Sequence, residues 1–118
     1  MDIETIRAYC LSYKGTTEGF PFDDTTLVIK VGGKIFVLIN IDENPSVNLK
    51  CDPTRAIELR EEYPAITPGY HMNKKHWNTV VLNSSLPDSF LFEMIDHSYH
   101  LVLKSLPGKL QFETEQKI

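Results

Sequence analysis

Residues 26–41 read TLVIKVGGKIFVLINI, and this stretch decides the fold. Two runs rich in β-branched residues flank Gly32 and Gly33. Glycine takes positive φ without steric cost, so a two-glycine turn between such runs is a strong signal for a β-hairpin. The stretch therefore predicts two antiparallel strands, over residues 26–31 and 34–41.

Alternation of apolar and polar residues defines the two faces of the predicted sheet. Leu27, Ile29 and Val31 oppose Val28 and Lys30 on the first strand. A further strand over residues 46–51 alternates in the same way. One of its faces carries Val47, Leu49 and Cys51, and the other carries Ser46, Asn48 and Lys50. One face is expected to be covered and the other at least partly open to solvent, as antiparallel sheets permit.

Helix signals lie on both sides of this sheet. Asp2 is expected to cap a helix that runs to about Ser12, and Asp52 with Pro53 begins another that ends before Pro64. A strand over residues 77–82 and a helix over residues 87–105 follow. The order α-β-β-β-α-β-α predicts an α+β two-layer sandwich, an antiparallel sheet with helices on one face. We expect residues 1–107 to form a single domain and residues 108–118 a C-terminal tail.

Composition narrows the classes of function. The chain has 118 residues, 42% of them apolar, and a formal net charge of −4, which disfavours bulk attraction to nucleic acid or anionic lipid. No apolar run approaches a membrane span, and the first residues lack the basic and apolar segments of a signal peptide. We expect a cytoplasmic monomer with Cys10 and Cys51 as free thiols and no membrane partner.

Residues 67–79, TPGYHMNKKHWNT, contain cations and aromatic rings but no acid. This composition is typical of a loop that contacts phosphates and stacks on bases, although an ordinary polar turn is an alternative interpretation. Lys30 and Lys50 would enlarge the patch if they lie beside it. The candidate nucleic-acid-binding residues are Lys30, Lys50, Tyr70, His71, Asn73, Lys74, Lys75, His76, Trp77, Asn78 and, as a further hydrogen-bonding side chain, Thr79.

Other chemistries find weaker support. His97 and His100 beside Glu93 could bind a metal, but this face lies opposite the apolar stripe of its helix and is expected to be solvated. Cys51 shares a strand face with apolar residues, so a packed thiol is preferred over a nucleophile paired with His71 or His76. No GxSxG, P-loop or GxGxxG motif occurs. We expect no catalytic residue, metal or cofactor.

Several segments resemble the MmcQ/YjbR family of small bacterial proteins: FPFDD at 20–24, VIKVGGKIF at 28–36, VNLKCDP at 47–53, residues 67–80, and IDHSY at 95–99. Family members often have Leu-Pro-Gly after the first helix, where this chain has Tyr13-Lys14-Gly15. The resemblance implies a fold similar to CyaY (bacterial frataxin) and a double wing motif predicted to bind DNA. Iron binding is not expected, because the first helix offers only Asp2 and Glu4.

The sequence thus favours a non-enzymatic DNA-binding protein. The alternative is a module that binds a protein or small ligand through the surface between Tyr70 and Trp77, since aromatic residues and Met72 are typical of interface cores.

Overall fold

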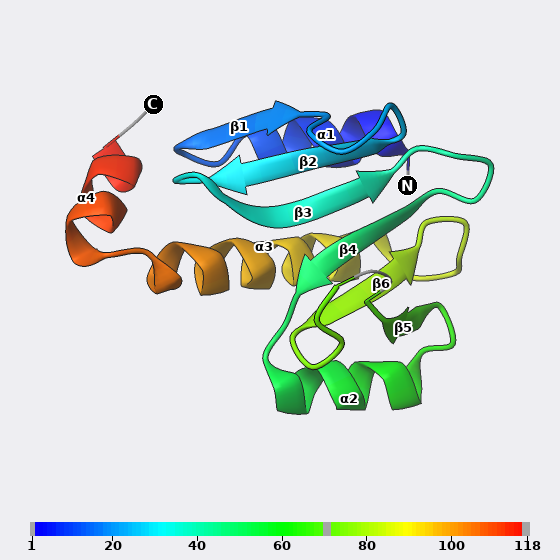
Figure 1. The fold of residues 1–118 in the computed structure, drawn as a ribbon. Helices are drawn as coiled ribbons and strands as arrows, with labels where there is room; N and C mark the ends of the chain where they lie inside the picture. The colour runs from blue at the N-terminus through cyan, green and yellow to red at the C-terminus, as the bar shows by residue number, and fades with distance from the viewer. Residues whose placement is uncertain (1, 70–71, 117–118) are drawn as a thin grey trace.

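A computed structural model describes residues 2–69 and 72–116. These residues form a six-stranded antiparallel sheet with the order β1-β2-β3-β4-β6-β5 and helices packed against it (Figure 1). The elements are α1 (Ile3–Leu11), β1 (Thr16–Gly19), β2 (Thr26–Val31), β3 (Lys34–Asn40), β4 (Ser46–Lys50), α2 (Pro53–Glu62), β5 (Ile66–Pro68), β6 (Trp77–Val81), α3 (Asp88–Ser105) and α4 (Gly108–Gln116).

Local signals place the elements where the sequence predicts them. Gly32 and Gly33 have φ values of 56° and 85° in the β2–β3 turn, which is the left-handed conformation that glycine tolerates. The Asp2 side chain accepts a hydrogen bond from the Thr5 N–H at the start of α1. The Asp52 side chain does the same for Arg55 at the start of α2.

The helices cover one face of the sheet, and the other face is open, as expected. Figure 1 shows α1 and α3 behind the sheet, with α2 beside β5 and β6. Residues that point toward the helices form one large core, including Ile29, Ile39 and Val47 from the sheet and Ile6 and Ile95 from α1 and α3, all 0% exposed. The predicted α+β two-layer sandwich is therefore confirmed.

A β-bulge at Phe36 joins α3 to the sheet. The β2–β3 register shifts between Ile29 and Lys30, so that Phe36 is an extra residue on β3. The Ser98 hydroxyl from α3 donates to the Phe36 carbonyl (2.6 Å) and accepts from the Lys50 N–H (2.9 Å). This one hydroxyl bridges β3 and β4 just beyond their last paired residues, Val37 and Leu49.

Three elements differ from the sequence prediction. The predicted order α-β-β-β-α-β-α has no strand at Thr16–Gly19 or Ile66–Pro68, but these residues form the two edge strands β1 and β5. The expected C-terminal tail contains helix α4, because Thr114 is 1% exposed and packs beside the turns at Gly15 and Gly32. Short edge strands and a terminal helix carry little local signal, since long-range pairing and packing stabilise them.

Within the described part of the chain, every helix is too short or too polar to cross a membrane.

Candidate functional site

The open face of the sheet has opposite charge at its two ends. β2 and β4 end where β3 and β6 begin, as the arrowheads in Figure 1 show. One end, here called the lysine end, consists of Lys30, Lys50, Lys74 and Lys75. The opposite end, the acidic end, consists of Asp23, Asp24, Asp42 and Glu43.

Strand pairing brings the lysine end together from distant parts of the sequence. Lys50 is paired with Trp77 across β4 and β6. The Cys51 N–H donates to the His76 carbonyl (2.7 Å), which extends the pairing by one residue. Lys74 and Lys75 therefore lie directly beyond the end of β4 that carries Lys50.

Arg60 holds the turn that bears these two lysines. Its guanidinium donates to the Lys74 carbonyl, to the Trp77 carbonyl (3.1 Å) and to the Asn78 side-chain oxygen (2.6 Å). The Asn73 side-chain oxygen accepts from the Lys75 N–H (2.9 Å) and closes the turn. The backbone of the turn is thus fixed, while the two lysine side chains are exposed.

The lysine end is not neutralised by neighbouring acids in the described structure. The ion pairs found among the described residues are those of Arg7 with Glu4 (3.8 Å) and Glu18 (2.6 Å), which lie on α1 and β1. Four ammonium groups at one end of a face form a site for anions such as phosphates.

Trp77 and Asn78 do not have the surface roles predicted for them. Trp77 is 9% exposed and packs with Val28, Leu38 and Met72 in a small cluster on the open face. Asn78 is 2% exposed and points to the other face, where Arg60 and the Ala56 carbonyl occupy its amide. Both residues position the lysine-bearing turn, and neither presents its side chain to a ligand.

Only some of the other predicted nucleic-acid-binding residues come together. Lys30, Lys50, Lys74 and Lys75 come together, with Asn73 exposed beside them and His76 half-buried. Tyr70 and His71 lie outside the described residues. Thr79 lies on the open face, where its hydroxyl donates to Asn48 (2.6 Å).

Sequence reasoning missed Phe22. Its side chain is 66% exposed. It lines a groove of about 570 Å³ on the open face together with Leu38, Asn48 and Met72. That Phe22 shares this groove with Met72, 50 positions later in the sequence, has no local signal. Lys34 follows the two glycines at the same end as Lys30, but its pairing with the core residue Val31 turns it to the other face of the sheet.

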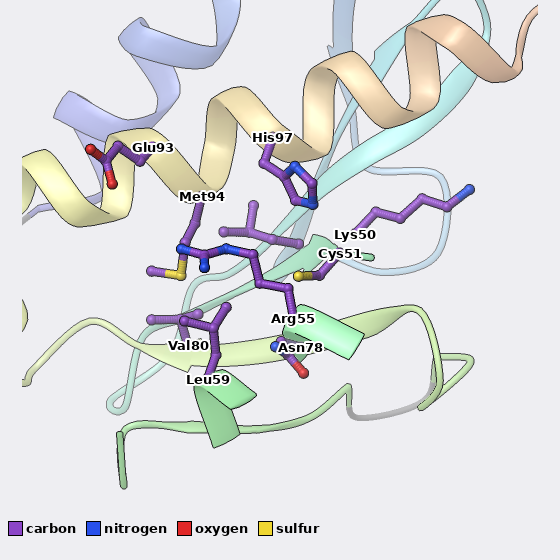
Figure 2. A pocket seen from close by; sticks show the side chains of 10 residues that line it. Lys50, Cys51, Arg55, Leu59, Asn78, Val80, Glu93, Met94 and His97 are labelled. Atoms are coloured by element: carbon purple, nitrogen blue, oxygen red, sulfur yellow. The ribbon is translucent and has the colours of Figure 1, made fainter. Parts of the chain in front are cut away.

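A second, much smaller cavity of about 30 Å³ lies on the helix side of the sheet, between α2 and α3. Figure 2 shows the side chains of Cys51, Arg55 and His97 around it, with the Arg55 guanidinium reaching toward Met94 and Lys50 extending away. The His97 side chain is half-buried, contrary to the solvated helix face that was expected, and its Nε2 accepts from the Asp52 N–H (3.2 Å). Burial lowers the pKa of His97.

The two thiols lie in apolar surroundings. Burial raises the pKa of Cys10 to about 12 and also raises the pKa of Cys51. A thiol with a raised pKa is a poor nucleophile at neutral pH, and the cavity beside Cys51 has room for about one water molecule. Among the described residues, no group of three His, Cys, Asp or Glu side chains has the geometry to hold a metal ion.

Fold and site together define a small α+β domain whose sheet is open on one side and carries its cations at one end. Known proteins share this architecture. A family model described as YjbR matches residues 11–101. The chain is 36% identical to YjbR of Escherichia coli K12 over 91% of this chain and 92% of that protein. It is 38% identical to YbdF of Escherichia coli O157:H7 over 92% and 89% of the two chains.

Solved structures agree with these matches. The crystal structure of protein DR2400 from Deinococcus radiodurans is similar with a TM-score of 0.89 and 39% identity, covering 95% of this chain and 86% of that one. A crystal structure from Pseudomonas syringae is similar with a TM-score of 0.76 and 27% identity, covering 86% and 99%. The chain belongs to the YjbR family.

Proposed function

We propose that this protein binds DNA through the lysine end of its open sheet face, without catalysing a reaction on it. The observation that carries the proposal is the convergence of four lysines from three separate segments on one end of one face. Lys30 and Lys50 are two strands apart, about 10 Å, and Lys74 and Lys75 lie in the turn that leads into the next strand, β6. Long lysine side chains at this spacing can reach neighbouring phosphates along a nucleic-acid backbone.

The separation of charge explains how a chain with a net charge of −4 could bind a polyanion. The acids of the open face lie at the other end of the strands, beyond Thr26 and Asn40. Hydrogen bonds from Thr25 and Thr26 lower the pKa of Asp23, so this carboxylate remains charged. DNA would be attracted at one end of the face and repelled at the other, which orients the complex.

Salt-dependent binding tests the proposal. Fluorescence anisotropy with a labelled DNA duplex between about 25 and 200 mM salt should give a log–log slope near −3.6 if about four phosphates are neutralised. The double variant Lys74→Ala/Lys75→Ala should make the slope shallower by about 2. These side chains are exposed and the turn is held by backbone groups, so the fold should be kept.

A matched control removes the same charge elsewhere. Lys104 and Lys109 are exposed on the two C-terminal helices α3 and α4, and neither belongs to a strand of the sheet. Lys104→Ala/Lys109→Ala should leave the slope within about 0.5 of the parent value. Absence of binding at about 50 mM salt, or equal weakening by both double variants, would overturn the proposal.

A protein partner on the same face is the second candidate, because Phe20 and Phe22 are 51% and 66% exposed. Aromatic side chains of this kind are enriched in interface cores. A partner captured from nuclease-treated lysate, and lost when Phe22 is changed to Ser, would favour this function over DNA binding.

A further inference from the structure

The open face holds two neighbouring hollows beside the lysine end. The first is the groove of about 570 Å³ between Phe22 and Met72. The second, of about 300 Å³, is lined by Phe20, Val28 and Lys30. Val28 is paired with Leu38, which lies in the first groove, so the hollows are adjacent across β2 and β3.

Polar groups on the floor of the first groove suit a heteroaromatic ring. The Asn48 side-chain oxygen accepts from Thr79 (2.6 Å), which leaves its amide N–H groups for a ligand among the described contacts. The Asn40 amide donates to Asp42 (2.8 Å), which leaves the Asn40 side-chain oxygen as an acceptor. A donor and an acceptor on neighbouring strands match the mixed donor and acceptor edge of a nucleobase.

The walls of the groove are apolar. Phe22 is two-thirds exposed on one side, and Met72 is half-buried on the other. An exposed aromatic ring beside a polar floor is the arrangement with which single-strand-binding proteins stack unpaired bases. The second hollow likewise has an exposed aromatic ring in its wall, that of Phe20, which is half exposed.

The distance from the hollows to the lysines fits one nucleotide. Asn48 and Lys50 lie on the same strand face two residues apart, which is about 7 Å. Val28 and Lys30 have the same separation on β2. This distance is comparable to that from a base to its own phosphate, so bases in the hollows would place phosphates at Lys30 and Lys50.

We propose that the open face binds single-stranded DNA, with two successive unpaired bases seated beside Phe20 and Phe22 and their phosphates at the lysine end. This inference rests on the proposed function and specifies its substrate. A duplex cannot seat its bases in the hollows, because they are stacked on each other and their pairing edges are occupied, so it would use the lysine contacts alone. The single strand crosses the strands of the sheet from β2 toward β6.

Three ligands of equal length separate the base contribution from the phosphate contribution. Anisotropy is measured at fixed low salt with labelled decathymidine, with an abasic strand of the same length, and with a decamer duplex. We expect decathymidine to bind at least about fivefold more tightly than the abasic strand, the lower range for one stacked base. Equal affinity for decathymidine and the abasic strand overturns the inference.

Variants of the groove provide the second test. Phe22→Ala should weaken decathymidine binding about tenfold, as expected for loss of one stacking ring, without changing the salt slope. Ile57→Ala is the matched control, since Ile57 is a 54% exposed apolar side chain on α2, and it should stay within twofold. If binding depends on Lys74 and Lys75 but neither on bases nor on Phe22, this inference is overturned, while the proposal of DNA binding through the lysine end is supported. Loss of all DNA binding in the parent protein overturns both proposals.

Discussion

Ser98→Ala tests how α3 is joined to the sheet. Ser98 is 0% exposed, and its hydroxyl is the bridge between the Phe36 carbonyl and the Lys50 N–H. Alanine fits the same space but leaves both backbone groups without this partner. A buried polar group left unsatisfied costs about 1–3 kcal/mol. The Lys50 end is only half-buried, so water can partly replace the hydroxyl there. We therefore expect the free energy of unfolding to fall by about 2–4 kcal/mol.

Urea denaturation followed by circular dichroism measures this change. The midpoint should fall while the m-value stays constant, because the surface exposed on unfolding is the same. Ser105→Ala on the same helix is the control, since the Ser105 hydroxyl bonds to the Val102 carbonyl at an exposed position, and it should change stability by less than about 0.5 kcal/mol. If Ser98→Ala costs no more than this control, the bridge does not stabilise the fold and the reasoning is refuted.

Two further predictions concern the turn and the histidine. Gly32→Ala should destabilise the protein by at least about 1 kcal/mol more than Gly33→Ala. Both glycines have positive φ, but only at Gly32 would an added Cβ meet a buried side chain, because the Leu106 Cδ1 would lie 2.6 Å from it. Equal thermal melting temperatures for the two variants would contradict this. Burial lowers the pKa of His97, so the folded state favours the neutral imidazole. The contribution of His97 to the free energy of unfolding is therefore fully present above the unfolded pKa of 6.5 and is lost as the pH falls below it. The variant His97→Gln can still accept the hydrogen bond from the backbone N–H. Its free energy of unfolding should fall less between pH 7.5 and 5.5 than that of the parent protein. Parallel curves of unfolding free energy against pH for the two proteins would show the His97 argument to be wrong.

The strands and helices with strong local signals follow from the sequence. The glycine pair at Gly32 and Gly33 fixes the β2–β3 turn because the backbone there needs positive φ. Asp52 and Pro53 fix the start of α2 because a side-chain oxygen and a ring without an N–H suit the first turn of a helix. Alternation along β4 also assigns Lys50 to the open face correctly.

The candidate site was predictable only in part. Lys30 and Lys50 could be assigned to one face, and Lys74 with Lys75 to one basic segment, from residues close in the sequence. An ordinary turn whose Trp77 packs against the sheet was the alternative interpretation, but the face on which Trp77 packs, beside Met72, could not be predicted, because an aromatic residue at the start of a strand is compatible with either face.

What the sequence determined by itself is the set of elements and the face to which each strand residue points, because these depend on a few neighbouring dihedral angles and side chains. Only the tertiary structure decided that β6 pairs with β4, which joins Lys74 and Lys75 to Lys50, and that Phe22 lies across the open face from Met72. Such neighbours are selected by hydrogen-bond pairing and burial between segments far apart in the chain. The energies of those contacts cannot be read from local residue patterns, because they depend on residues that are distant in the sequence.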